Sequence, residues 1–519
     1  MTTRFSSPSS HASPAAPLTS SGAPPPAGGG DLISDDLLVR VLELLPDARD
    51  AVRTHALSRR WRALWTRVAA LRFHSDRRRW ELREPGPPEQ FVAFVDRALA
   101  LRAAEKEPAL EHLDISFDLS QHESEELVPP TIEAAQRWIR YAMQHEVKSL
   151  TCKVHLPWPH IDDDDDDNMT IITLGILSAE LETMRLALSS LKLRLPSTAA
   201  FASLTDLSLE SMVLEAGGAH LLARFVSSAC CPRLHRLQLA AVMEMETLLI
   251  DAGALLELSL EDIDDMLFLQ LRTPSLRVLH VKRCNELVEL KVSAPRLEDI
   301  KFLVQNPLHI DGYLHDDDRN NDGSIRLLEC CRLIRCLEIC LEIVETMNRR
   351  KIMLWQQLEV DIIKGSIPQL PHVTSLKIHV TLGEGRSSYA AGIASLLAQC
   401  SSIRYLGLNF RYWKNDPELG LTRDNSAPSW ESHELSLPHL QVAEFEKLMG
   451  TDDEHQFIQF ILTRTTGIQK VAFGFDQKSG KKAAKMVVNL CHALAGVVHE
   501  WRPTVEIEVL RLNSLHHTC

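Results

Sequence analysis

The chain has 519 residues, a formal net charge of −14 and 45% apolar residues. This length exceeds what one compact core accommodates, so several domains or one extended array are expected. The acidic balance disfavours bulk binding of a polyanion such as nucleic acid, and no apolar run reaches the roughly 18 residues of a membrane-spanning helix. Eleven cysteines, an odd number scattered along the chain, favour reduced thiols over a disulfide framework.

Residues 1–30 are rich in Ser, Pro, Ala and Gly and have no apolar segment long enough for a secretory signal. Too few large apolar side chains are present to offset the entropy of ordering, so a disordered tail is predicted. A plastid transit peptide is the alternative, although Arg4 is the only Lys or Arg of the stretch. We expect an intracellular protein of the nucleus or cytoplasm that is not secreted.

Order is predicted to begin at "DLISDDLLVRVLELLP", residues 31–46. Ser34 is a typical helix cap, and Asp35 and Asp36 suit the positive end of the helix dipole. Apolar residues then recur at helical spacing, at Leu37, Leu38, Val41, Leu42 and Leu45. Pro46 ends this helix, and a second helix is predicted over 48–55.

A third helix is predicted to contain "HALSRRWRALW", residues 55–65. Leu57, Trp61, Leu64 and Trp65 are spaced to share one helix face. Residues 47–80 hold ten arginines against three aspartates, which keeps a nucleic-acid-binding segment open as an alternative. A unit this small buries little surface, however, so its outward Leu and Val side chains require a partner.

The segment 31–75 resembles the F-box, the short helical module that docks on the Skp-type adaptor of cullin-RING ubiquitin ligases. The similarity is carried by the Leu-rich first helix, by Leu45-Pro46 and by "LSRRWRALW". Ile33-Ser34 stands where the family has Leu-Pro, which implies weaker adaptor binding. The adaptor-binding residues that the resemblance implies are Ile33, Leu37, Val41, Leu42, Leu45, Pro46, Val52, Leu57, Trp61 and Trp65.

After a linker at 76–108, an internal period of 21 residues appears. The blocks "CPRLHRLQL", "AGALLELSL", "TPSLRVLHV" and "APRLEDIKF" place Leu234, Leu255, Leu276 and Leu297 at equal steps. Alternating apolar residues after a turn predict one short strand per repeat, which is the signature of a leucine-rich-repeat solenoid. Looser copies flank the blocks, for example "LEHLDISF" and "VTSLKIHV". The solenoid is predicted over 109–436, with an irregular stretch at 304–370.

The C-terminal region, 437–519, contains "LPHLQVAEF", a helix at 453–464 and a strand through Val471 and Phe475. A long helix over 483–498 and a final strand at 505–509 are also predicted. The run resembles the FBD region that follows leucine-rich repeats in many plant F-box proteins. The predicted fold class is therefore α/β, with a small N-terminal helical F-box and a solenoid that has one strand per repeat and helices or loops on its convex side.

Several chemical motifs are weak. "DRNNDGSIRLLE" matches a calcium-binding EF-hand loop through Asp318, Asn320, Asp322 and Glu329, but the preceding Pro and Gly do not suit an entering helix. An acidic loop is the preferred interpretation, so neither a metal site nor a cofactor is predicted. Cys330, Cys331, Cys336 and Cys340 lack the spacing of a zinc site, and a glycine-containing stretch at 474–482 departs from a phosphate-binding loop.

The sequence therefore predicts a non-catalytic receptor. The F-box would bind the Skp-type adaptor and through it a cullin, while the repeat face holds an unknown target protein for ubiquitination. Two alternatives stay open. One is a repeat scaffold with a degenerate F-box, and the other is a nucleic-acid-binding protein that uses the arginines of 47–80.

Overall fold

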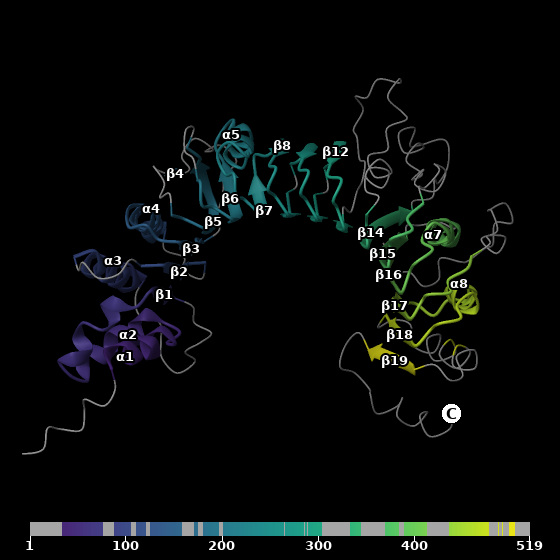
Figure 1. Ribbon diagram of the computed structural model, residues 1–519, viewed down its shortest axis with the longest axis horizontal. Helices are drawn as coiled ribbons and strands as arrows, with labels where there is room; N and C mark the ends of the chain where they lie inside the picture. Colours follow the sequence, from purple (N-terminus) through teal and green to yellow (C-terminus); the bar gives the residue numbers. More distant parts are fainter. Residues whose placement is uncertain are drawn as a thin grey trace, which may run out of the picture.

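The computed structural model describes residues 34–75, 88–104, 110–120, 125–157, 171–174, 180–196, 201–303 without 264, 285 and 288, 333–343, 369–382, 389–412, 435–476, 486, 490 and 498–503. These residues form an arch whose inner side is a long parallel sheet and whose outer side carries helices and a second, smaller sheet (Figure 1). The predicted α/β class and the solenoid architecture are confirmed.

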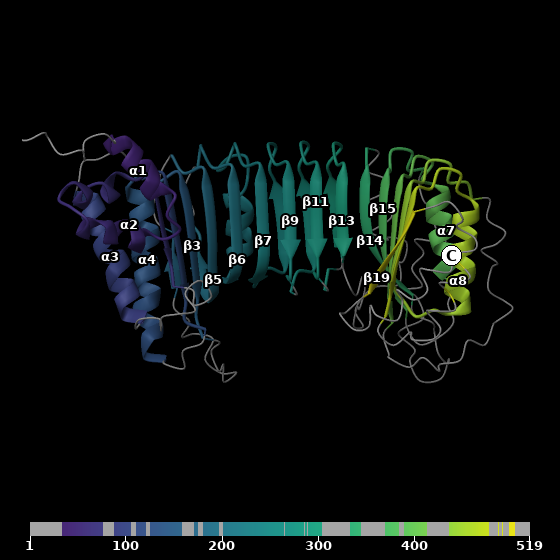
Figure 2. The same cartoon turned by 90° about the horizontal axis from the view of Figure 1, so that it is seen from below.

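Within the described residues, the inner sheet has 16 strands, and every pairing between them is parallel. Figure 2 looks onto these strands from inside the arch. They follow one another in chain order, except that β4 pairs only with β5. The strands are β1 (Ala70–His74), β2 (His112–Asp118), β3 (Ser149–His155), β4 (Ile171–Thr173), β5 (Thr183–Arg194), β6 (Asp206–Leu214), β7 (Arg236–Met243), β9 (Glu257–Glu261), β11 (Val278–Lys282), β13 (Asp299–Leu303), β14 (Cys336–Ile343), β15 (Ser375–Leu382), β16 (Tyr405–Tyr412), β17 (Val442–Leu448), β18 (Lys470–Phe475) and β19 (Val498–Pro503).

The period of 21 residues is confirmed as the register of the sheet. Leu237 pairs with Leu258, Leu258 with Leu279, and Leu279 with Ile300. The four block leucines, Leu234, Leu255, Leu276 and Leu297, are all fully buried beneath the turns that precede these strands. Each repeat thus adds equivalent side chains to one continuous core, which is how a solenoid is stabilised.

A second parallel sheet lies on the outer side of this period-21 array and differs from the expected loops or helices. It consists of β8 (Thr247–Asp251), β10 (Phe268–Arg272) and β12 (Glu289–Ser293), in the order β12-β10-β8. Its inward residues repeat at the same interval, since Leu248 pairs with Leu269 and Leu269 with Leu290. A repeat of 21 residues has room for two five-residue strands and their turns but not for a helix of several turns.

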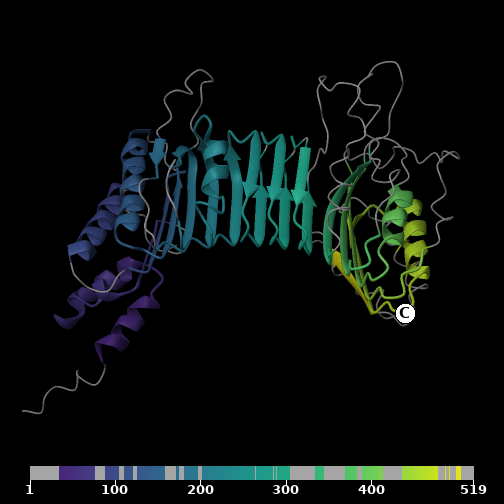
Figure 3. The ribbon, with the colours of Figure 1, turned by 45° about the horizontal axis from the view of Figure 1, so that its top comes forward.

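Helices cover the outer side where the repeats are longer (Figures 1 and 3). They are α3 (Pro88–Ala104), α4 (Val128–Gln144), α5 (Gly218–Phe225), α7 (Tyr389–Ala398) and α8 (Asp452–Thr463). The segment 76–108, which was predicted to be a linker, contains the helix α3. This helix forms because its apolar residues recur at helical spacing, and Phe91, Val95 and Leu99 are buried. Phe91 stacks on Phe117 of β2 with ring centroids 4.8 Å apart.

The N-terminal unit consists of α1 (Asp35–Glu43), α2 (Ala48–Arg53) and three short 3-10 turns, η1 (Thr54–Ala56), η2 (Arg60–Arg62) and η3 (Trp65–Arg67). The continuous third helix predicted here is wrong. Thr54 and Thr66 donate hydroxyl hydrogen bonds of 2.6 and 2.7 Å to carbonyls three residues earlier, and such local bonds compete with the regular helical pattern. The unit is joined to the solenoid by β1, which is the first strand of the inner sheet.

Two further segments refine the predicted boundaries. The irregular stretch at 304–370 contains β14, which pairs in register with β13 and β15, so the sheet continues through it. Cys336 and Cys340, two of the four clustered cysteines, lie on this strand. Near the C-terminus, β17, α8 and β18 match the predicted elements, and β19 begins at Val498, the last residue of the predicted long helix. The predicted strand at 505–509 lies outside the described residues.

Candidate protein-docking site

The helix α1 has two apolar sides. Ser34 caps it by accepting a hydrogen bond from the Leu37 backbone N–H at 3.4 Å. Leu38 and Leu42 are buried in the N-terminal unit. Leu37 and Val41 lie on the other side and are 55% and 52% exposed. A soluble helix normally buries its apolar stripe and exposes polar residues, so this second stripe is unusual for a surface without a partner.

Leu44 extends the exposed stripe and is not among the adaptor-binding residues predicted from the sequence. It follows Leu37 by seven residues and Val41 by three, so all three lie within about 60° around the helix axis, at 100° per residue. Leu44 is 83% exposed and Leu57, which follows η1, is 68% exposed. The helical spacing of Leu44 from Leu37 and Val41 is the feature of the sequence from which its place in the stripe could have been predicted. We call Leu37, Val41 and Leu44 the α1 stripe.

The predicted adaptor-binding residues fall into three groups. Leu37, Val41 and Leu57 are exposed and available to a partner. Leu42 and Trp65 are buried and support the unit from within. Leu45, Val52 and Trp61 are half-buried and pack against the core. Pro46 is half-buried as well. Ile33 lies outside the described residues.

The arginines of this unit are largely engaged within the chain. Arg60 Nε lies 2.6 Å from Asp35 Oδ1, and Arg67 Nη2 lies 3.1 Å from Asp36 Oδ1. Arg49 stacks over the Phe91 ring at 4.9 Å. Because aspartates at the start of α1 neutralise two of these cations, the positive charge predicted for a nucleic-acid-binding helix is reduced on this surface.

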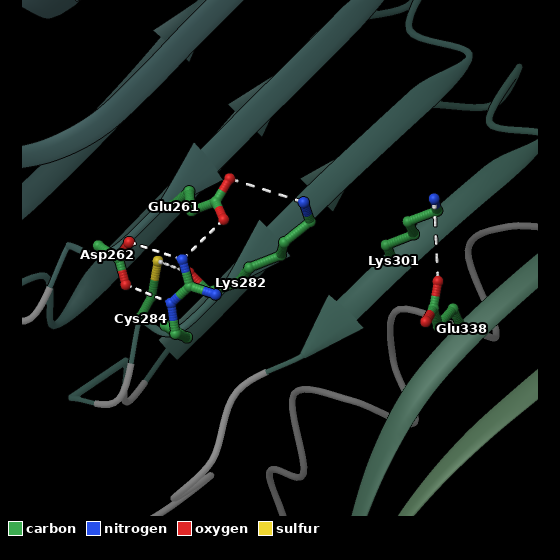
Figure 4. Close-up of polar contacts among 7 residues, drawn as sticks. Glu261, Asp262, Lys282, Cys284, Lys301 and Glu338 are labelled. Atoms are coloured by element: carbon green, nitrogen blue, oxygen red, sulfur yellow. Dashed lines mark hydrogen bonds and ion pairs between the residues drawn. The ribbon is translucent and has the colours of Figure 1, made fainter. Parts of the chain in front are cut away.

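The inner face of the sheet is a second candidate surface, crossed by ion pairs between neighbouring strands. Arg236 of β7 contacts Asp206 of β6 at 3.0 Å and Glu257 of β9 at 3.1 Å. Lys282 of β11 contacts Glu261 of β9 at 3.6 Å, as Figure 4 shows. Such pairs are partly solvated and each contributes at most about 1 kcal/mol to stability. Their arrangement gives this face a fixed pattern of alternating charge.

Glu338 of β14 is the centre of a charged group on the inner face. His379 Nε2 lies 2.7 Å from Glu338 Oε1, and the ammonium groups of Lys301 and Lys377 lie 3.8 and 4.0 Å from this carboxylate. Figure 4 shows Lys301 reaching across from the neighbouring strand. The hydrogen bond with His379 lowers the pKa of Glu338, and the positive charges of His379, Lys377 and Lys301 add to this effect against partial burial.

An aromatic ring is held flat against the same face at β16. Tyr405 lies over Gly407, since a Cβ atom on Gly407 would be 3.0 Å from the Tyr405 hydroxyl oxygen and 3.1 Å from Lys377 Cγ. The hydroxyl donates a 2.8 Å hydrogen bond to Glu444 of β17. An oriented tyrosine surrounded by charged groups is a favourable contact point for a protein partner, because little side-chain entropy remains to be lost.

The chemistry-bearing residues of the described chain do not assemble into a metal centre. Within the described ranges, no three His, Cys, Asp or Glu side chains are close enough to hold a metal ion. Burial raises the pKa of the Cys152, Cys231 and Cys400 thiols to about 12, which keeps them protonated near neutral pH. The EF-hand-like loop with Asp318 lies outside the described residues. None of the described helices is both long and apolar enough to cross a membrane.

Comparisons with known proteins agree with this architecture. No family model matches the chain. An FBD-associated F-box protein of Arabidopsis thaliana is 28% identical over 493 residues, which cover 88% of this chain and 98% of that protein. An F-box/FBD/LRR-repeat protein of the same plant is 24% identical over 67% of this chain and 75% of its own length. A further FBD-associated F-box protein is 34% identical, but over only 25% and 26% of the two chains.

The chain is thus similar, along most of its length, to plant F-box proteins that carry leucine-rich repeats and an FBD region. The resemblance inferred from the sequence is confirmed. The structure adds that the FBD-like part is continuous with the repeats, because β17, β18 and β19 extend the same inner sheet.

Proposed function

We propose that this protein is the substrate-recognition subunit of an SCF-type, cullin-RING ubiquitin ligase. Its N-terminal unit docks on a Skp-type adaptor, which connects it to a cullin, and the inner face of its solenoid holds a target protein. The receptor forms no covalent bond itself. Its contribution is proximity, since holding the target near the ubiquitin-carrying subunits makes the transfer effectively intramolecular. We place it inside the cell, in the nucleus or cytoplasm.

The observation that carries the proposal is the α1 stripe. Burying a large apolar side chain is worth roughly 1.5–3 kcal/mol, so leaving Leu37, Val41 and Leu44 in water forgoes a stabilisation of several kcal/mol. An adaptor groove that covers the stripe recovers this free energy on binding. The relatives named as F-box proteins support the same role for this unit.

The inner face supports target binding in a different way. Its side chains are polar, fixed by cross-strand contacts and arranged over many strands, as suits a broad and selective protein contact. The centre at Glu338 and the ring of Tyr405 lie on strands β14 and β16, with β15 between them. We assign the strongest target contacts to this part of the arch.

The direct test is capture of the adaptor. Tagged full-length protein is produced in plant cells and the purified complexes are analysed by mass spectrometry for adaptor and cullin peptides. Wild type should recover both. Leu37→Asp combined with Val41→Asp should lose both, because carboxylates on the α1 stripe would remain desolvated in the interface.

Leu101→Asp is the matched control, since Leu101 is an exposed apolar residue on α3, outside the α1 stripe. It should capture adaptor and cullin like wild type. Recovery of the adaptor by the double variant, or no recovery by folded wild type, would refute the proposed ligase role. The second result would leave a repeat scaffold with a degenerate F-box.

A further inference from the structure

The edge of the inner sheet at which its strands begin changes charge along the arch. Because these strands are all parallel, the residues that precede them lie along one edge. Figure 2 shows the strands side by side in this arrangement. Ahead of β2, β3 and β5 the edge is acidic, and its charged residues there are Glu111, Glu146, Lys148, Glu180 and Glu182. Ahead of the later strands the sign is reversed.

We call the later part of this edge the basic rim, and define it as the three residues before each of β11, β13, β14, β15, β16 and β17. These residues are 275–277, 296–298, 333–335, 372–374, 402–404 and 439–441. The rim contains the guanidinium groups of Arg277, Arg296, Arg335 and Arg404 and one carboxylate, that of Glu298. It is therefore a positive surface on a chain whose formal net charge is −14.

Three of the rim arginines are available to a partner. Arg296, Arg335 and Arg404 are exposed, and among the described residues they form no ion pair. Arg277 Nη2 lies 3.0 Å from Glu298 Oε2. The hydrogen bond from Arg277 lowers the pKa of Glu298, and the charge of Arg335 adds to this effect. The rim carboxylate is thus already engaged, while the other arginines keep their charge for an anionic ligand.

The rim arginines are spaced to suit an extended chain. Neighbouring strands of a sheet are about 4.8 Å apart, so the step from β13 to β16 spans about 14 Å, the length of about four extended residues. Arg296 and Arg404 lie at the two ends of this stretch, with Arg335 and the exposed His372 between them. Arginine suits carboxylates in particular, because it can donate two parallel hydrogen bonds to the two oxygens.

The rim adjoins the part of the inner face to which the strongest target contacts are assigned. Arg404 directly precedes Tyr405, whose ring lies over Gly407. Arg335 directly precedes β14, the strand of Glu338. Arginine and tyrosine are enriched among the residues that dominate binding at protein interfaces. A nucleic acid is disfavoured, because single-strand binding proteins stack bases on aromatic side chains and none of the rim positions holds Phe, Tyr or Trp.

We propose that the basic rim binds an Asp- or Glu-rich segment of the target protein. The segment lies in an extended form across the strand ends, and its carboxylates pair with Arg296, Arg335 and Arg404. Neighbouring residues of the target then reach Tyr405 and the charged group around Glu338. This inference rests on the target-binding role proposed above and names the class of target, a protein with an exposed acidic segment.

The test uses the full-length protein and a fluorescein-labelled peptide of about nine residues that alternates aspartate and serine, long enough to cross the rim arginines. Fluorescence anisotropy at low salt, where exposed charges are weakly screened, gives Kd for wild type and for a rim variant. The rim variant carries Arg296→Gln, Arg335→Gln and Arg404→Gln. We expect it to bind the peptide at least about tenfold more weakly than wild type.

The matched control removes the same charge from exposed arginines of α3, α4 and α5, through Arg97→Gln, Arg140→Gln and Arg224→Gln. It should bind within about twofold of wild type. Equal losses in the two variants would show general charge attraction and overturn the proposal. It would also be overturned if folded wild type did not bind the peptide, or if the rim bound a single-stranded oligonucleotide of equal charge more tightly.

Cross-linking locates the contact without any variant. A benzophenone-labelled form of the same peptide should give adducts around 296–298, 333–335 and 402–404 when the products are mapped by mass spectrometry. Adducts mainly within the arginine-rich residues 34–75 would contradict a site on the rim. These readouts need no adaptor, and the rim variant should still capture adaptor and cullin. Failure of the rim site and failure of the ligase role therefore give different results.

Discussion

The period-21 array and the N-terminal unit use apolar residues in opposite ways. In the array, Leu234, Leu255 and their equivalents are fully buried, and the strands that follow them alternate buried apolar residues with polar ones, as Leu258 and Leu260 do in β9. In the N-terminal unit, Leu44 is among the most exposed apolar residues, and Leu37 and Val41 are more than half exposed. The array is therefore complete by its own contacts, while the unit has an apolar surface left for another protein.

The difference follows from local geometry. A strand has two faces, and in a solenoid the outer layer covers one of them. Apolar residues on that covered face alone are therefore enough to build the core of the array. A helix on the surface of a small unit normally has polar residues on its outer side, so a second apolar side marks an interaction surface. The contrast can be tested by placing the same charge in each region.

The largest effect is expected from Leu276→Asp in the array. An unpaired carboxylate would lie between stacked repeats, at a cost of about 3–5 kcal/mol in the free energy of unfolding. Leu44→Asp, at an exposed position, should unfold like wild type. Urea denaturation followed by circular dichroism gives both values. If Leu276→Asp and Leu44→Asp were equally stable, the solenoid core would be wrongly assigned.

The next largest effect concerns Trp65, the buried tryptophan of the N-terminal unit. Trp65→Ala should lose about 3 kcal/mol or more, because a cavity replaces the indole, and the half-buried Trp61 should cost less when truncated. Limited proteolysis with peptide mapping locates the unfolding at residues 34–75. A larger loss at Trp61 than at Trp65 would contradict the packing described for this unit.

A smaller effect is expected at the start of α8, in the FBD-like part. Thr451 accepts a 3.2 Å hydrogen bond from Glu454 N–H, and the Glu454 carboxylate accepts 2.8 and 2.9 Å bonds from the backbone N–H groups of Gly450 and Thr451. Thr451→Ala should reduce stability by about 1 kcal/mol through loss of this capping box. Thr451→Ser retains the hydroxyl and is the control. Equal melting temperatures for the Ala and Ser variants would contradict the cap.

The smallest effect is a pH dependence at Glu338. Its folded pKa is lowered mainly by His379, so ionised Glu338 stabilises the fold above its unfolded pKa of roughly 4.3, and this stabilisation is lost as the pH falls through the folded value. Wild type should therefore exceed Glu338→Gln in stability more at pH 7 than at pH 3. Differential scanning calorimetry measures the gap, and a gap that widens on acidification would exclude this ion pair as its source.

Much of the fold was predictable because the repeat fixes the register of the sheet. The sequence predicted the inner strands from "LRVLHV" and its copies. The outer strands were missed, although Leu248, Leu269 and Leu290 also recur at steps of 21 residues. A five-residue strand has only two inward residues, and two alternating apolar side chains do not distinguish a strand from a loop.

The candidate docking site was predicted less completely. The resemblance to the F-box led to Leu42 and Trp65 being predicted as adaptor-binding residues, but both are buried. It did not include Leu44, which is exposed. Helical spacing shows that α1 has two apolar sides but does not determine which of them faces the core. The buried side is fixed by the packing of η2, η3 and β1, which follow later in the chain. Inner-face contacts such as Tyr405 over Gly407 depend on pairing between distant segments and leave no local signal.

We propose that the apolar α1 stripe, and not the arginines beside it, binds the adaptor. Isothermal titration calorimetry at two salt concentrations should compare wild type, Leu37→Ala with Val41→Ala, and Arg59→Gln with Arg62→Gln against purified Skp-type adaptor. We expect the apolar pair to weaken binding about a hundredfold and the arginine pair by less than about threefold, since exposed charges mainly steer association. If the arginine pair caused the larger loss and its effect disappeared at high salt, adaptor binding through the α1 stripe would be contradicted.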